Sequence, residues 1–197
     1  MANKQTGKGI PMSTFSRRGF LATAGSAGLI TAGCANGVGS RGGDAIDARV
    51  DATLNYLYSR YPGTRELADK STGMLVMPLV TEAGFGIGGA YGRGALRVAG
   101  ASVDYFMHAQ ASFGLQIGVQ QYAHVLFFMN QEALSNFRVS DGWVAGANIK
   151  YALDGAGDRL SADTITALSP VVAVVFGQAG LIVGATLEGS KYTRIIA

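Results

Sequence analysis

Few residues of this chain have types and spacing that could perform chemistry, and the most conspicuous set is a run of glycines. Gly84, Gly86 and Gly89 have the G-x-G-x-x-G spacing of a dinucleotide-binding turn, and Asp104 follows twenty residues after the first of them. That turn requires a helix directly behind it, because the helix N-terminus holds the pyrophosphate. Here the alternation of residue types continues through residues 91–96, which predicts a strand. We therefore reject a nucleotide site.

Other candidates for catalysis or metal binding are sparse. His108 and His124 are the only histidines and lack metal-ligand spacing, which favours structural roles. Ser112 lacks the preceding glycine of a nucleophile elbow. One polar loop does not match an EF-hand and is expected to be a solvated turn rather than a calcium site, although it contains Asp154, Asp158 and Asp163. We therefore expect no enzyme, no metal and no cofactor.

The first 34 residues have the features of an export signal. Arg17 and Arg18 form a twin-arginine pair, and an uncharged stretch of small and apolar residues follows at 22–33. This stretch is shorter than the roughly 20 apolar residues that a membrane-spanning helix needs. The pattern resembles signals of the Tat pathway, which exports folded proteins. Met12 is an alternative start to Met1.

The only cysteine, Cys34, stands where such a signal would be cut. Residues 30–33 resemble a lipobox in which Thr31 replaces the usual leucine. We expect Cys34 to be acylated, since several acyl chains give stable anchoring. An ordinary cleavage site or a buried, inert thiol is the alternative. Ala35 follows where aspartate would resemble an inner-membrane retention signal, so we expect an outer-membrane lipoprotein that faces the periplasm.

The basic charge of the chain belongs to this leader. Four of the 16 basic residues and none of the 13 acidic residues precede Cys34, so the rest of the chain carries a net charge of about −1. A nucleic-acid partner is therefore not expected. Residues 35–43 contain four glycines and predict a flexible tether. Residues 44–197 are expected to form a single domain.

The domain should open with an amphipathic helix from Asp44. Ile46, Val50, Leu54 and Leu57 recur at spacings of three and four, and Pro62 with Gly63 stops the pattern. A second short helix is predicted over 64–71, with Gly73 closing it.

From residue 74 onward the hydrophobic pattern has a period of two. Strands are predicted at 74–78, 83–91, 95–98, 103–110, 113–121, 124–129 and 143–153, with a last hairpin of 171–176 and 181–187. Asn130 should cap a short helix that ends at Phe137. In residues 84–94 one strand face consists almost wholly of glycine, which indicates sharp curvature or close backbone approach rather than a ligand groove. We predict an α+β fold with N-terminal helices on a strongly curved, mainly antiparallel sheet or partial β-barrel.

Five segments, in order, resemble the SYLF domain family, and the resemblance extends from Ala68 to the C-terminus. They are residues 73–78, 83–94, 112–120, 125–134 and 180–189. The resemblance implies phospholipid binding, which in the eukaryotic branch involves an N-terminal amphipathic helix and basic residues; some fungal relatives bind actin. This chain has no SH3 domain and has acidic as well as basic residues on its first helix, so we carry over neither phosphoinositide nor actin binding.

The leading functional hypothesis is therefore an envelope-anchored, non-enzymatic phospholipid-binding protein. We expect a headgroup site where two basic pairs converge, Arg93 with Arg97 and Lys191 with Arg194. The apolar face of the first helix, Ile46, Val50, Leu54 and Leu57, is a second candidate lipid contact. The alternatives are four solvated charges and a helix that docks on the sheet. A structural lipoprotein that binds an unknown envelope protein is the alternative function.

Overall fold

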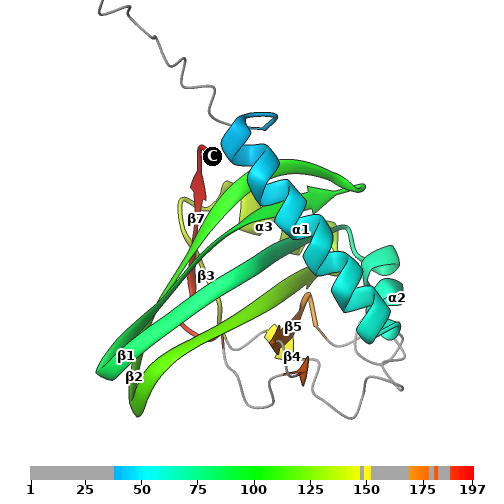
Figure 1. Cartoon of the computed structure of the whole chain (residues 1–197). Coiled ribbons are helices and arrows are strands. Elements are labelled where there is room, and N and C mark those ends of the chain that lie inside the picture. The colour runs from blue at the N-terminus through cyan, green and yellow to red at the C-terminus, as the bar shows by residue number, and fades with distance from the viewer. Residues whose placement is uncertain (1–37, 147–148, 152–168, 178–179, 182–186) are drawn as a thin grey trace, which may run out of the picture. The chain divides into compact units, whose positions relative to one another are not determined.

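The structure, a computed structural model, describes residues 38–146, 149–151, 169–177, 180–181 and 187–197 (Figure 1). The chain divides into two units, Met1–Cys34 and Ala35–Ala197, and every described residue belongs to the second unit. The predicted export signal, Cys34, the beginning of the predicted tether and the loop with Asp154, Asp158 and Asp163 all lie outside the described residues.

The first helix, α1 (Arg41–Arg60), begins three residues before the predicted start at Asp44. Ser40 is the reason, because its hydroxyl accepts a hydrogen bond from the Gly43 N–H at 2.9 Å and so caps the helix. The same hydroxyl donates to the carbonyl of Ala197 at 2.8 Å. The end of the predicted tether, from Ser40 to Gly43, therefore belongs to the folded domain.

The second helix, α2 (Gly63–Lys70), follows α1 almost directly. Gly73 does not close it, contrary to the prediction. Ser71 is the C-cap, and both its backbone N–H and its hydroxyl donate to the carbonyl of Ala68. Gly73 is instead the first residue of β1.

Two very long antiparallel strands, β1 (Gly73–Val98) and β2 (Ala101–Phe128), replace the six short strands predicted between residues 74 and 129. They pair from Gly73 opposite Phe128 to Val98 opposite Ala101. The pairing shifts at three places, the first where Pro78 and Leu79 face one residue of β2, and then resumes each time. Apart from the turn at Ala99 and Gly100, most residues that we interpreted as strand breaks are paired residues within continuous strands.

Both strands fold back on themselves near their midpoints (Figure 1), and the glycine face of β1 makes this possible. A Cβ atom on Gly84 would lie 2.6 Å from the Cα of Gly88, and one on Gly92 would lie 2.7 Å from the carbonyl oxygen of Leu79. A Cβ on Gly94 would overlap the carbonyl oxygen of Val76. The two halves of β1 thus pack backbone against backbone, which confirms the predicted curvature and close approach.

The remaining strands flank the two halves of β2. One half pairs with β5 (Val171–Gly177) and the other with β7 (Lys191–Ile195), a strand that the sequence pattern did not predict. The single strand predicted at 143–153 is wrong: β3 (Trp143–Val144) pairs with β7, whereas β4 (Ile149–Tyr151) pairs in parallel with β5. Of the last predicted strand, the structure describes Leu181, which belongs to β6 (Gly180–Leu181) and pairs with β5 as expected, and Leu187, which lies outside any strand.

Two hydrophobic cores hold this α+β fold together. The first lies between the sheet and the helices α1 and α2, and it contains Val76 and Ala95 from opposite halves of β1. The second lies on the opposite face of the strands, where Leu75, Phe106 and Leu126 pack with Phe137 of α3 (Gln131–Val139). Asn130 caps α3 as predicted, accepting from the Ala133 N–H at 2.8 Å. The sheet is a curled, mainly antiparallel half-barrel with helix α1 across its outer face (Figure 1).

Candidate functional site

The apolar face of α1 is not a lipid contact in this structure. Val50 and Leu57 have no exposed surface, and Ile46 and Leu54 are also buried in the core beneath the helix. Polar contacts also hold the helix against the sheet: Asp47 accepts hydrogen bonds from the hydroxyls of Ser102 at 2.6 Å and Tyr105 at 2.9 Å. The helix docks on the sheet, which was the alternative interpretation.

The four basic residues do not converge into one headgroup site. Arg97 lies under α1, where its guanidinium forms an ion pair with Asp51 at 2.6 Å and donates to the carbonyl of Gly100 at 3.0 Å. Arg194 lies 3.5 Å from Asp104 and donates to the carbonyl of Arg138 at 2.7 Å. Both side chains are thus occupied by protein partners.

Arg93 and Lys191 remain on a common surface. Arg93 is opposite Met107, which is opposite Thr193 on β7, and Lys191 lies two residues before Thr193. Because side chains of a strand alternate between faces, Arg93 and Lys191 share the outer face of the sheet, whereas Arg194 is on the other face. Both Arg93 and Lys191 are exposed.

The outer face also carries an exposed apolar cluster where β1 and β2 fold back. Phe85, Ile87 and Val119 are 78%, 73% and 70% exposed, and we call these three residues the apolar bend. Further along β1, Tyr91 is 46% exposed and its hydroxyl accepts a 2.7 Å hydrogen bond from Arg93. The sequence held a signal for this surface, because Phe85 and Ile87 are large apolar residues in an otherwise glycine-rich strand.

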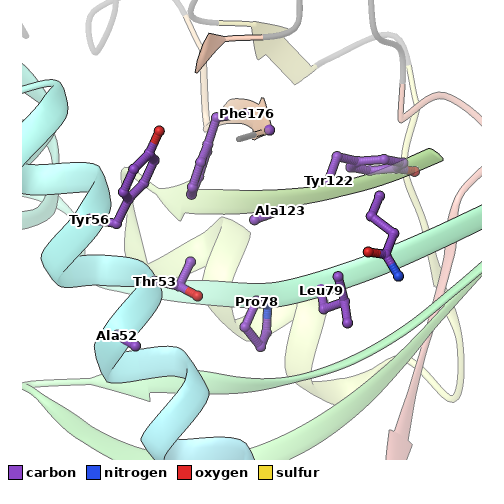
Figure 2. A pocket seen from close by; sticks show the side chains of 10 residues that line it. Ala52, Thr53, Tyr56, Pro78, Leu79, Tyr122, Ala123 and Phe176 are labelled. Atoms are coloured by element: carbon purple, nitrogen blue, oxygen red, sulfur yellow. The ribbon is translucent and has the colours of Figure 1, made fainter. Parts of the chain in front are cut away.

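An open groove of about 360 Å³ lies beside α1 on the same outer face (Figure 2). The rings of Tyr56 from α1 and Phe176 from β5 stack at one end with their centroids 6.0 Å apart. The bulge at Pro78 and Leu79 forms another side. None of the described residues that line the groove is charged.

The two histidines meet in the interior because β2 folds back. Their ring centroids are 5.1 Å apart although both belong to that strand. His108 Nε2 lies 3.0 Å from Ser190 Oγ, and His124 Nε2 lies 2.9 Å from the hydroxyl of Tyr192. Burial lowers the pKa of His108 to about 4 and also lowers the pKa of His124, to which the neighbouring His108 contributes.

This arrangement does not form a hydrolase site. A serine beside a histidine can act as a nucleophile only if substrate reaches it. His108, His124, Ser190 and Tyr192 have no exposed surface, so substrate has no access to them. Within the described ranges, no three His, Cys, Asp or Glu side chains are placed to hold a metal ion, and no helix is long and apolar enough to cross a membrane.

Comparison with protein families assigns the second half of the chain. Residues 109–194, which include most of β2, α3 and most of β7, match the family model Ysc84, described as Las17-binding protein actin regulator. This region is a SYLF (Ysc84) domain. The match confirms the resemblance inferred from the sequence over residues 109–194, which contain three of its five segments. A SYLF (Ysc84) domain indicates a family of lipid-related or actin-related binding. A search of curated proteins found no match.

Proposed function

We propose that this SYLF-domain protein is a non-enzymatic, envelope-anchored phospholipid-binding protein that contacts the bilayer through the apolar bend. The observation that carries the proposal is the exposure of Phe85, Ile87 and Val119 together at the fold of two long strands. Exposed aromatic and aliphatic side chains gathered on one surface indicate a membrane or protein contact. Actin is not proposed as a partner, because an exported protein would not meet it.

The residues that follow the apolar bend have the chemistry of successive layers of a membrane, from the hydrocarbon outwards to the headgroups. Tyr91 follows Ile87 by four residues on the same strand, a distance of about 13 Å at ~3.3 Å per residue. One leaflet of hydrocarbon is about 15 Å deep, and tyrosine favours the boundary of that layer. Arg93 and Lys191 lie farther along this face, where their charges would meet phosphate oxygens.

Replacing Phe85 and Ile87 together by serine should weaken binding to phosphatidylglycerol–phosphatidylethanolamine vesicles about 10-fold to 100-fold. Complete burial of one such side chain is worth about 1.5–3 kcal/mol, and insertion into the bilayer achieves part of this for each residue. Flotation of the compact unit 35–197 with vesicles measures the effect without the acyl anchor.

Val139→Ser is the matched control, because Val139 is 75% exposed but lies at the end of α3. It should bind vesicles like the wild type. Equal binding by the double variant, or an equal loss in the control, would contradict the proposal. Failure of the wild type to bind any vesicle would instead favour the structural role with a protein partner.

We further propose export by the twin-arginine route. Replacing Arg17 and Arg18 by lysine should strongly reduce the amount of protein in the envelope fraction, because that route reads the arginine pair. Fractionation followed by immunoblotting measures this amount. An unchanged level in the envelope would exclude the route.

Acylation of Cys34 and sorting to the outer membrane complete the proposal. Mass spectrometry of the mature protein should find Cys34 as the first residue, with acyl chains attached. Cys34→Ser should lower the amount of protein in the membrane fraction, because only the contact through the apolar bend would then remain. An unmodified cysteine, or a mature chain that begins elsewhere, would refute this step.

A further inference from the structure

The groove beside α1 has the chemistry of a site for an uncharged, elongated ligand. Its volume of about 360 Å³ is within the range of small-molecule sites, roughly 300–1,000 Å³. Its polar side chains are neutral: they include those of Thr53 and Gln121. Without a charged partner, the groove favours hydrocarbon over ionic ligands.

The groove is also continuous with the apolar bend along one face of the hairpin. Leu79 is 41% exposed at the groove, and Ala83, opposite Val119, is exposed between Leu79 and Phe85. The cross-strand pair of Thr81 and Gln121, 3.3 Å apart, is the polar interruption. From Leu79 to Phe85 the strand covers about 20 Å, comparable to the ~15 Å depth of one leaflet.

We propose that the groove holds one acyl chain of a phospholipid taken from the membrane that the apolar bend contacts. This inference rests on the proposed function and adds the ligand of the neighbouring surface. The chain lies between the stacked rings of Tyr56 and Phe176 and the bulge at Leu79, with its headgroup outside the groove. The source is the bilayer rather than the anchor on Cys34, because the apolar strip leads from the groove to the bend.

The test compares two tryptophan substitutions on the exposed side of α1. Ala52 lines the groove, so Ala52→Trp should fill it, whereas Ala48→Trp, one turn earlier and also exposed, should leave it open. The unit 35–197 is incubated with phosphatidylglycerol–phosphatidylethanolamine vesicles and separated from them, and its phospholipid is then quantified by mass spectrometry. We expect about one phospholipid per chain for wild type and Ala48→Trp, and a loss of at least about five-fold for Ala52→Trp.

Vesicle flotation separates this inference from the proposed function. Ala52→Trp should still bind vesicles, because its apolar bend is intact. The variant Phe85→Ser/Ile87→Ser should lose vesicle binding but still take up pyrene-labelled lysophosphatidylcholine supplied as monomers. Equal phospholipid content in Ala52→Trp and wild type, or no phospholipid in wild type that does bind vesicles, would overturn the groove assignment. The lipidated full-length protein could fail to take up lysophosphatidylcholine although the unit 35–197 takes it up. That result would make the acyl chains on Cys34 the occupant of the groove and would also overturn the assignment.

Discussion

Gly94→Ala should destabilise the domain by about 3 kcal/mol, a large fraction of the roughly 5–15 kcal/mol that stabilises a typical domain. The added methyl group would overlap the carbonyl oxygen of Val76 and lie 2.7 Å from the sulfur of Met77. Neither half of β1 can move away, because Val76 and Ala95 are both packed in the core beneath α1. Urea denaturation followed by circular dichroism measures the free energy of unfolding.

Gly89→Ala is the matched control on the same strand. Its Cβ would approach only the carbonyl oxygen of Gln110, at an ordinary 3.4 Å. Alanine also loses less conformational entropy on folding than glycine, so the control should be neutral or slightly more stable. If Gly94→Ala is as stable as this control, the two halves of β1 do not pack against each other as described.

Acidification from pH 7.5 to pH 5 should lower the free energy of unfolding by about 2 kcal/mol through His108 alone. The pKa of His108 is lowered from 6.5 to about 4 in the folded protein, so between these values the unfolded chain binds more protons. The contribution of His108 to the free energy of unfolding is therefore fully present above pH 6.5 and is lost as the pH falls towards 4. His124 acts in the same direction, since burial and the charge on His108 both lower its pKa.

The groups around the two rings limit how the protons can be accommodated. Ser190, Tyr192 and Tyr122 face the histidines as uncharged partners, and Glu82 is the carboxylate that offsets the burial of His108. His108→Gln should reduce the difference in stability between pH 7.5 and pH 5, because it removes one titrating group. Equal stability of the wild type at both pH values, measured by urea denaturation, would contradict this account.

The parts of the fold that the sequence predicted depend on local patterns. The spacing of Ile46, Val50, Leu54 and Leu57 predicts a helix with one buried face, and Asn130 predicts the start of α3. The two long strands could not be predicted, because Pro78 and the glycines usually interrupt strands, whereas here cross-strand pairing continues past them. The partly polar sequence of β7 becomes a strand through pairing with both β2 and β3.

The candidate site was predicted less well because it depends on distant partners. Arg97 is bound by Asp51, which lies 46 residues away on a different element, and no local pattern indicates that pairing. The alternation of residues 84–94 predicts a glycine face, and Phe85, Ile87, Tyr91 and Arg93 therefore share the other face of that strand. Their exposure depends on the fold of both strands, which puts the glycine face inside and these side chains outside.

The depth of Ile87 in the bilayer tests the proposed membrane contact most directly. The only cysteine of the chain is Cys34, so Ile87→Cys in the unit 35–197 gives a single site for an environment-sensitive NBD label. Val139→Cys is the control position, because it lies far from the apolar bend. The neighbouring Arg138 contacts Asp104, which is paired with Leu96. Leu96 is about 30 Å from Ile87 along β1. On vesicles with nitroxide-labelled acyl chains, the label at Ile87 should shift to the blue and be quenched, whereas the label at Val139 should stay in water. A label at Ile87 that remains in water while the protein is bound to the vesicles would contradict the account.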